Sequence, residues 1–346
     1  MQGINDQPTI AVVILNWNGR KYLEQFLPSV LASTYKNLVV YVADNGSTDD
    51  SIEFLKEHYP TVKLIAHKTN EGFAGGYNRA LKEVPEEFLV LLNSDIEVSP
   101  GWLEPAIALF NSHPDLAAIQ PKILDYNKRD HFEYAGAAGG WIDRFGYPFS
   151  KGRIFDVLEK DQGQYNAPTA IFWASGAAMI IKKSVFNEVG GFDPYFFAHQ
   201  EEIDLCWRIH LYGYQIMSCP ASVVHHIGGG TLPKDSPNKL FLNFRNNLIM
   251  LWKNLSGFEA VYIIVTRFLL DAVSAWKNLL AGQRGFFIAV VRAHLGFITW
   301  VISSKRQSVF PKKRSGQVKG MYNGSIVWQH FIMGRSKFSE IISDMN

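Results

Sequence analysis

The chain has 346 residues, of which 47% are hydrophobic, 14% aromatic and 19% charged, a composition that excludes a disordered protein and allows one large domain or two smaller ones. The net charge of +2 is too small to indicate nucleic-acid binding, and the two cysteines do not suggest a disulfide framework. The N-terminal MQGINDQPTI has no basic segment followed by an apolar run, so we expect no secretory signal and a reducing, cytoplasmic compartment.

Four apolar runs alternate with amphipathic segments in the first hundred residues. Strands are predicted over residues 9–15, 38–43, 62–66 and 88–92, with loops and helices between them. The last run is the clearest, because five successive apolar residues are typical of a strand that is buried on both faces. Repetition of strand, loop and helix predicts an α/β doubly wound sheet.

Polar residues follow these strands in the segments NWNG, DNGSTD, NEGFAGGYNR and NSD. Ligands of open α/β sheets bind beyond the carboxyl ends of the strands, so the segments predict a nucleotide site. The glycines of the third segment allow close backbone approach, and we expect the following helix to present free N–H groups. No GxGxxG follows the first strand, which disfavours a dinucleotide cofactor, and the absence of GxxxxGK[ST] argues against a P-loop NTPase.

Asp95 in the NSD segment has two interpretations. Its carboxylate can hold a divalent cation, which in turn can hold a diphosphate. Alternatively, Asp95 caps the turn that follows the strand.

Beyond residue 100 the chain continues as a helix over residues 102–111 and a strand over 116–123. The pattern weakens over residues 125–168, which predicts loops and short strands and, from position only, a segment that faces an acceptor. Order returns with a strand over residues 177–181 and a short helix over 184–189.

Three carboxylates, Glu201, Glu202 and Asp204, lie at the head of the next amphipathic helix. One interpretation is compensation of the helix dipole, which favours negative charge in any first turn. The other is that one carboxylate faces the cleft as a general base, with a pKa tuned by the neighbouring Phe196 and Phe197.

A strand over residues 215–224 precedes the segment HHIGGGT. A histidine at a strand end can bind a metal or a phosphate, and the residues alone do not decide between His225 and His226. The three glycines predict a loop that moves or lies tight against a ligand.

The character of the chain changes near residue 240. A helix is predicted over residues 240–255, and residues 258–280 and 285–302 are apolar but interrupted by charged residues or histidine, so a membrane span is not expected. Residues 282–339 contain ten Lys or Arg and no Asp or Glu, including the cluster Lys312-Lys313-Arg314. This pattern suits an anionic membrane surface; the alternative is a helical hairpin packed on the core with a solvated basic tail.

The chain resembles the family-2 glycosyltransferases, which have the GT-A fold, and among them the bacterial rhamnosyltransferase-like members. The resemblance covers about residues 8–255 and rests on seven segments in the family's order and spacing. These are VVILNWNG, VADNGSTDDS, NEGFAGGYNRAL, LLNSDIEV, SGAAMIIKK, GGFDPYFFAHQEEIDLCWR, and VVHHIGGGT followed by Arg245-Asn246.

The resemblance implies a role for each matching position. The base and ribose pocket would be lined by Asn16, Asn18, Asp44, Asn45 and Ser47, and the nucleotide and diphosphate would be bordered by Asn70, Gly72 and Asn78. The family's DxD metal motif corresponds to Asn93, Ser94 and Asp95, and the acceptor side would be lined by Trp173 and Gly176. The position of the catalytic base corresponds to Glu202, with Glu201 as its neighbour, and the metal-binding histidine is matched better by His226 than by His225. The chain departs from the family at Asn93, which replaces the first Asp of the motif, and at Glu202, where the family has Asp.

The resemblance therefore implies a mixed GT-A sheet over residues 1–239, with a nucleotide-sugar half at about 8–125 and an acceptor half at about 126–239, followed by a membrane-associating region over 240–346. The implied activity is inverting transfer from a nucleotide-diphospho-sugar, dTDP-rhamnose or a UDP-hexose, to a hydroxyl of a glycan or lipid-linked acceptor in cell-surface polysaccharide synthesis. Mg²⁺ or Mn²⁺ is the implied cofactor, and the inner face of the cell membrane the expected location.

Two alternatives remain open. A sugar-phosphate nucleotidyltransferase would need a Gly-rich loop with a basic residue after the first strand, which NWNGRK matches poorly. A non-catalytic sugar-nucleotide-binding protein on the same fold would not need a candidate base, metal ligand and glycine loop together.

Overall fold

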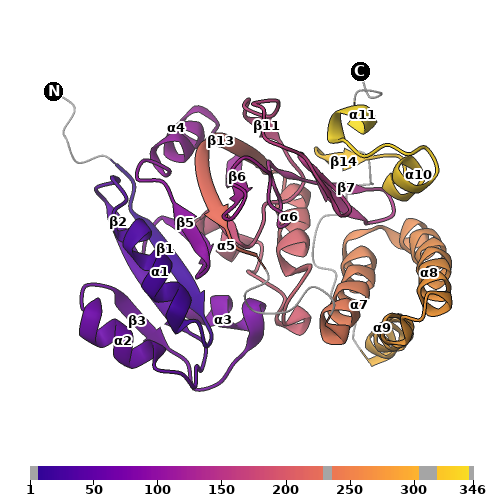
Figure 1. The fold of residues 1–346 in the computed structure, drawn as a ribbon, viewed down its shortest axis with the longest axis horizontal. Coiled ribbons are helices and arrows are strands. Elements are labelled where there is room, and N and C mark those ends of the chain that lie inside the picture. The colour runs from indigo at the N-terminus through magenta and orange to yellow at the C-terminus, as the bar shows by residue number, and fades with distance from the viewer. Residues whose placement is uncertain (1–6, 229–235, 304–317, 343–346) are drawn as a thin grey trace.

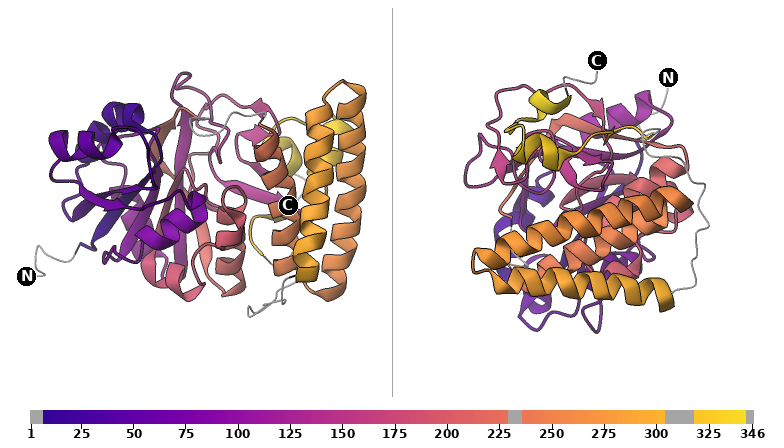
Figure 2. Two further views of the ribbon diagram at one scale, coloured as in Figure 1. Left: turned by 90° about the horizontal axis from the view of Figure 1, so that it is seen from below. Right: turned by 90° about the vertical axis from the view of Figure 1, so that its right-hand side faces the viewer.

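The computed structural model describes residues 7–228, 236–303 and 318–342. Its helices lie on both faces of a central sheet, and three long helices form a layer at one end of the molecule (Figures 1 and 2). The Lys312-Lys313-Arg314 cluster and residues Gly229, Gly230 and Thr231 of the predicted glycine loop lie outside the described residues.

The central sheet has nine strands. They are β1 (Ile10–Asn16), β2 (Leu38–Asp44), β3 (Lys63–Ala66), β4 (Phe88–Asn93), β5 (Ile96–Val98), β6 (Leu116–Asp125), β11 (Thr169–Ala170), β12 (Ala178–Lys182) and β13 (Gln215–His226). The order is β11-β13-β6-β12-β4-β1-β2-β3, with β5 paired to β13. The first four strands along the chain are parallel, whereas β12 runs antiparallel to β4 and β6. This mixed α/β sheet confirms the predicted fold class.

Successive side chains of β1 enter two different cores. Ile10, Val12 and Ile14 pack on one face with α1, α2 and α4, and Ala11 and Val13 pack on the other with α3, α5 and α6. Burial of both faces explains why the strand is continuously apolar. These helices are α1 (Arg20–Leu31), α2 (Ser51–His58), α3 (Gly72–Ala80), α4 (Glu104–Ser112), α5 (Lys183–Glu188) and α6 (Glu201–Leu211).

A second, smaller sheet lies in the region where the sequence predicts loops and short strands. It runs in the order β10-β9-β8-β7-β14 and comprises β7 (Gly140–Asp143), β8 (Pro148–Ser150), β9 (Arg153–Ile154), β10 (Val157–Leu158) and β14 (Met321–Tyr322). Phe149 and Ile154 of this sheet share a core with Phe338 and Ile341 of α11 (Phe338–Ile342). The last described segment, which also contains α10 (Ile326–Phe331), therefore packs on residues that precede position 239.

Three long helices, α7 (Pro237–Asn254), α8 (Gly257–Leu280) and α9 (Arg284–Ser303), form the layer at the end of the molecule. Leu248 to Leu251 of α7 belong to the same core as α6, so one side of this layer packs on the part of the protein that contains the central sheet. Two of the charged residues that interrupt the apolar pattern are buried partners, since an Arg267 nitrogen lies 3.2 Å from Asp271 Oδ1. His294 Nε2 lies 3.4 Å from Asp271 Oδ2, whereas Arg292 is exposed.

Within the described ranges, α9 is the one helix whose length and apolar composition match a membrane span, with a mean hydropathy of 1.8 over its most apolar window. This is weak support for a span, because core helices pass the same test.

Candidate active site

The ends of β1 and β2 bring four predicted nucleotide-site residues together. Asn16 and Asp44 are paired in register, and Asn16 Nδ2 donates to Asp44 Oδ2 at 3.0 Å. Asp44 Oδ1 accepts the N–H of Ser47 at 2.9 Å, and Ser47 Oγ accepts the N–H of Asn18 at 2.9 Å. Asn16 Oδ1 is buried with no hydrogen-bond partner among the described residues, so it can accept an N–H from a ligand.

Asn45 and Asn70 shape the loop between β3 and α3. Asn45 Nδ2 donates to Asn70 Oδ1 at 3.0 Å and to the carbonyl of Gly72 at 2.9 Å, and Asn70 Oδ1 accepts the N–H of Gly72 at 2.8 Å. Gly72 has φ +72°, and a Cβ there would overlap with Phe197, so only glycine fits.

The start of α3 does not present free N–H groups, so that sequence prediction is wrong. The N–H groups of Phe73 and Ala74 donate to the carbonyl of Phe197 at 2.7 and 3.2 Å. The backbone carbonyl of Phe197, which is far from α3 in the chain, thus accepts the hydrogen bonds that the sequence predicted for a ligand oxygen.

Asn78 connects α3 to the segment before α6. Its Nδ2 donates to the carbonyl of Phe192 at 2.7 Å, and its Oδ1 accepts the N–H of Phe192 at 2.9 Å. Both ends of the amide are therefore engaged within the chain, and its role beside a diphosphate stays a prediction.

Asp95 and His226 meet where β5 pairs with the end of β13. His226 Nε2 lies 3.1 Å from Asp95 Oδ1, both side chains are buried, and Asn93 Nδ2 lies 3.5 Å from the same ring nitrogen. Ser94 is near the loop after β1, since a Cβ on Gly19 would lie 3.3 Å from Ser94 Oγ. His225 instead has its Nδ1 3.9 Å from Glu97, so the geometry favours His226 as the partner of Asp95.

Glu133 is a member of this centre that the sequence did not indicate. Its Oε2 lies 3.1 Å from His226 Nδ1, at ion-pair distance although the angle is poor for a hydrogen bond. Burial disfavours a charged imidazole, but contacts with Asp95 and Glu133 outweigh it and raise the pKa of His226 to about 10. A carboxylate on the second nitrogen of a metal-binding histidine fixes the orientation of the ring.

The donor atoms of Asp95 and His226 fit a divalent cation if the His226 imidazole, whose pKa is about 10 without a cation, releases its Nε2 proton on binding. Carboxylate oxygen and imidazole nitrogen suit Mn²⁺, and Mg²⁺ is commonly held by one or two carboxylates together with substrate phosphates. The described residues contain no group of three or more His, Cys, Asp or Glu arranged to hold a metal by themselves. Diphosphate oxygens would therefore have to complete the coordination.

The three carboxylates at the head of α6 have different surroundings. Asp204 is buried and contacts Arg208 at 2.9 Å, Asn254 at 2.8 Å and Lys253 at 3.3 Å. Burial raises the pKa of Asp204, but the charges of Lys253 and Arg208 outweigh it, so the net pKa is lowered. Asp204 is thus an ionised structural group.

No cation of residues 7–228, 236–303 or 318–342 forms an ion pair with Glu201 or Glu202. The Oε2 atoms of both are buried without a hydrogen-bond partner in the part of the chain that the structure describes. Burial raises the pKa of Glu202 to about 7, and burial followed by the charge of Glu202 raises the pKa of Glu201 well above its ordinary value. Near neutral pH, Glu202 can therefore accept a proton, whereas burial and the charge of Glu202 both favour the neutral form of Glu201.

The segment that contains Trp173 and Gly176, which the sequence predicts on the acceptor side, packs in space between α3 and α6. Trp173 is buried, and its Nε1 donates to the carbonyl of Trp141 at 2.9 Å. The N–H of Ala174 donates to Cys206 Sγ at 3.4 Å, one turn along α6 from Glu202. A Cβ on Gly176 would crowd Phe73, so the segment is packed closely, and its contact with an acceptor stays a prediction.

The sequence matches the family model described as Glycosyl transferase family 2 over residues 11–190, more than half of the chain. It is 25% identical over 266 residues to an N-acetylglucosaminyl-diphospho-decaprenol L-rhamnosyltransferase of Mycobacterium tuberculosis, covering 72% of this chain and 85% of that protein. It is 24% identical over 224 residues to the poly-beta-1,6-N-acetyl-D-glucosamine synthase of Staphylococcus epidermidis, covering 62% of this chain and 48% of that protein.

Two solved structures share the fold. GalNAc-T7 with UDP, GalNAc and Mn²⁺ superimposes with a TM-score of 0.59 and 15% identity, covering 86% of this chain and 58% of that one. The mannosyltransferase PcManGT from Pyrobaculum calidifontis, with GDP-Man and Mn²⁺, gives a TM-score of 0.50 and 15% identity, covering 87% and 77%. The fold is GT-A, and the chain belongs to glycosyl transferase family 2.

Proposed function

We propose that the protein is an inverting, metal-dependent glycosyltransferase. It moves a sugar from a nucleotide-diphospho-sugar, dTDP-rhamnose or a UDP-hexose, to a hydroxyl of a glycan or lipid-linked acceptor in cell-surface polysaccharide synthesis. The observation that carries the proposal is Glu202, a partly buried carboxylate whose Oε2 has no hydrogen-bond partner among the described residues and whose pKa burial raises to about 7. That pKa is matched to a general base working near neutral pH.

The reaction is a single displacement at the anomeric carbon. The acceptor oxygen forms the new bond to that carbon, the bond from the carbon to the diphosphate oxygen breaks, and Glu202 takes the hydroxyl proton. A Mg²⁺ or Mn²⁺ ion held by Asp95 and His226 would neutralise the charge of the departing nucleoside diphosphate. Glu133 holds the His226 ring in place.

The remaining predicted site residues surround the donor. Asn16, Asn18, Asp44 and Ser47 form one contact network at the ends of β1 and β2, which would face the base and ribose. The similarity to a rhamnosyltransferase supports dTDP-rhamnose as a donor to test first, and the UDP and GDP-Man of the two solved structures support the wider class of nucleotide sugars.

A thermal-shift screen tests the donor site. We expect one class among dTDP-rhamnose, UDP-sugars and GDP-mannose to raise the melting temperature, and to do so more strongly with Mn²⁺. A ligand that binds only the folded state at a hundredfold excess over its Kd stabilises that state by about 2.7 kcal/mol. Stabilisation by a nucleoside triphosphate with a sugar phosphate, and by no nucleotide sugar, would instead indicate a nucleotidyltransferase.

We also propose that the enzyme acts at the inner face of the cell membrane and binds the membrane through the outer side of α8, α9 and α10. Exposed apolar side chains recur on α8 at intervals of three and four residues, which places them on one face. We call this surface the outer apolar face; its residues are Phe258, Tyr262, Val265, Leu269, Val273, Trp276 and Leu280 on α8, Leu295 and Ile302 on α9, and Trp328, Phe331, Ile332 and Met333 on and just after α10.

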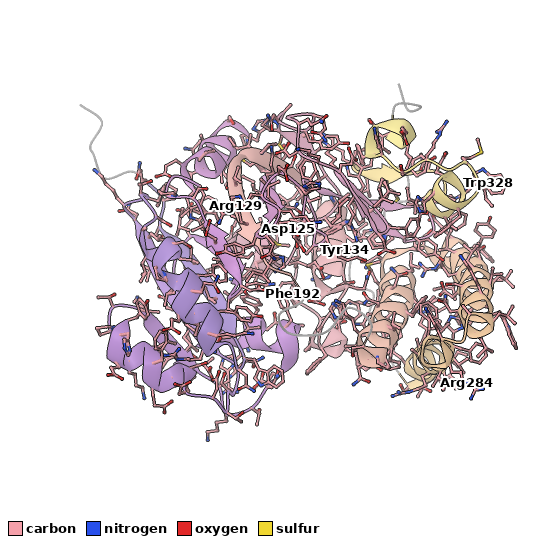
Figure 3. All side chains as sticks on the ribbon, in the orientation of Figure 1. Asp125, Arg129, Tyr134, Phe192, Arg284 and Trp328 are labelled. Carbon is pink, nitrogen blue, oxygen red and sulfur yellow. The ribbon has the colours of Figure 1, made fainter. Side chains whose placement is uncertain are left out.

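Side-chain contacts connect the three helices that carry the outer apolar face. The ring of Trp276 lies 5.1 Å from that of Phe287 on α9, and Lys277 Nζ lies 5.5 Å from the ring of Phe331 on α10. Figure 3 labels Arg284 and Trp328 on this side of the molecule. Soluble monomers rarely expose so large an apolar surface.

The charge beside the outer apolar face favours an anionic lipid surface as its partner. Arg284 and Arg292 are exposed on α9, and residues 282–339 contain ten Lys or Arg and no Asp or Glu. Apolar burial and cationic attraction together suffice for reversible binding to membranes that contain anionic lipids. A lipid-linked acceptor would then reach the enzyme from the side on which α7 packs against α6.

Vesicle flotation tests membrane binding. We expect the full chain to float with vesicles containing phosphatidylserine and much less with phosphatidylcholine vesicles, and Leu269→Glu to reduce flotation. Leu31→Glu, at an exposed leucine on α1, is the matched control and should float like the wild type. Protein that stays in the soluble fraction with both vesicles, or equal losses for the two variants, would contradict the proposal. A stable dimer without vesicles that Leu269→Glu dissociates would assign the face to a second copy instead.

A further inference from the structure

The segment that leads into the candidate base has a strained backbone. Phe197, His199 and Gln200 are not glycines, yet their φ angles are +62°, +69° and +72°. A positive φ is unfavourable for a residue with a Cβ and persists only where its surroundings fix the conformation. Gln200 directly precedes Glu201, the first residue of α6, so the conformation of this segment sets where the first turn of α6 begins.

One side of the segment is held by α3. The carbonyl of Phe197 accepts two N–H groups at the start of that helix, from Phe73 and Ala74. Gly72 allows this approach, since a Cβ there would overlap with Phe197. The segment is thereby tied to the loop that the sequence predicts beside the nucleotide.

The other side is held by one buried side chain of α7. Asn246 Nδ2 lies 2.9, 3.0 and 2.8 Å from the carbonyl oxygens of Phe196, Ala198 and His199. The guanidinium of Arg245 contacts Asn246 Oδ1 at 2.8 and 3.0 Å. Because a guanidinium only donates, this contact fixes which end of the amide faces the three carbonyls.

We propose that Asn246 is a positioning residue for Glu202, and that it acts by holding the Phe196–Gln200 segment in its left-handed conformation against α3. The inference rests on the proposed function, in which Glu202 is the general base. The neighbouring Asn247 supports the same segment, since its Nδ2 donates to Gln200 Oε1 at 3.1 Å.

Removal of the amide has a specific consequence. Three carbonyl oxygens lose their shared donor inside the protein. The residues with positive φ also lose the contact that stabilises their unfavourable backbone conformation. The first turn of α6 then shifts, and water reaches Glu202. Hydration favours the ionised form, so the pKa of the Glu202 carboxyl falls toward its ordinary value.

The test compares Asn246→Ala with Asn238→Ala, an exposed asparagine in the first turn of the same helix. For Asn246→Ala we expect kcat to fall by about 10- to 100-fold, as for a small misplacement of a catalytic group. The KM for the donor should stay near the wild-type value, and the acidic limb of the pH profile of kcat/KM should move to lower pH. Hydrogen exchange at the amides of Phe73 and Ala74 should become faster, because the partner carbonyl moves. Asn238→Ala should change none of these.

The outcomes separate the inference from the proposed function. The variant Asn246→Ala could lower the melting temperature and kcat while the pH profile and the hydrogen exchange at Phe73 and Ala74 stay unchanged. That result would assign Asn246 a structural role only and overturn the inference. If Asn246→Ala does not fold, Arg245→Ala frees the amide to rotate and should give smaller shifts in the same directions; no shift would again overturn it. A wild-type enzyme without an acidic limb, or an active Glu202→Gln variant, would overturn the assignment of the base itself.

Discussion

Glu202→Gln should lower kcat about a thousandfold, within the range that general-base catalysis contributes, and should leave nucleotide-sugar binding almost unchanged. The amide has nearly the shape of the carboxyl but cannot accept the hydroxyl proton. Binding is preserved because the polar residues predicted to hold the donor follow β1 to β4, whereas Glu202 is on α6. Single-turnover rates together with calorimetric titration of the donor measure both quantities. A loss of binding equal to the loss of rate would remove Glu202 from the base role.

The pH profile and Glu201→Gln sharpen this prediction. The pKa of Glu202 is about 7, and the base must be deprotonated, so kcat/KM should be level above that pH and fall about tenfold per pH unit below it. Glu201 is buried, and burial together with the charge of Glu202 raises its pKa, so its neutral form is favoured and glutamine is a close mimic of that form. Glu201→Gln should therefore keep most of the activity. The reverse pattern, an inactive Glu201→Gln and an active Glu202→Gln, would move the base to Glu201.

Asp95→Asn should lower kcat at least about a hundredfold, because a metal contributes several kcal/mol of charge stabilisation at its site and each 1.36 kcal/mol is tenfold in rate. EDTA should abolish turnover of the wild-type enzyme, and Mn²⁺ or Mg²⁺ should restore it. The variant should respond weakly to added metal, because it loses the carboxylate of the pair and keeps only the neutral imidazole of His226 as a ligand.

A readout other than activity separates metal binding from folding. Mn²⁺ with the nucleoside diphosphate should raise the melting temperature of the wild type and not that of Asp95→Asn. Asp115→Asn is the matched control, because this exposed Asp precedes the amino end of β6, whereas Asp95 follows the carboxyl end of β4, which runs in the same direction. Full activity of the wild type in EDTA, or an equal loss for the two variants, would contradict the role of Asp95.

The strands that carry the site were predictable because their pattern is local. Residues 88–92 were predicted as a strand and form most of β4, which ends at Asn93. A continuous apolar run must be buried on both faces, and in a parallel sheet the polar residues that follow such runs gather at one edge. For that reason Asn16 and Asp44 could be assigned to one site, and the structure pairs them directly.

The interpretation of α3 failed for the opposite reason. Glycines and a helix start indicated free N–H groups, but the carbonyl of Phe197, far along the chain, occupies them. Nothing near residues 70–79 indicates that partner. Glu133 was missed for the same reason: it stands in a region without clear periodicity, and only the fold places it beside His226.

The sequence by itself determined the α/β sheet and the strand ends at which the polar candidates gather, because these depend on periodicity within short segments. Its seven motifs, through their resemblance to family-2 glycosyltransferases, implied the family and the mixed GT-A fold. Only the tertiary structure decided which histidine meets Asp95, which carboxylate of α6 is neutralised by cations, and which side chains hold the strained segment before Glu201. These properties depend on burial and on contacts between residues far apart in the chain. The charge state of a carboxylate is set by what surrounds it in space, and a linear pattern does not contain that information.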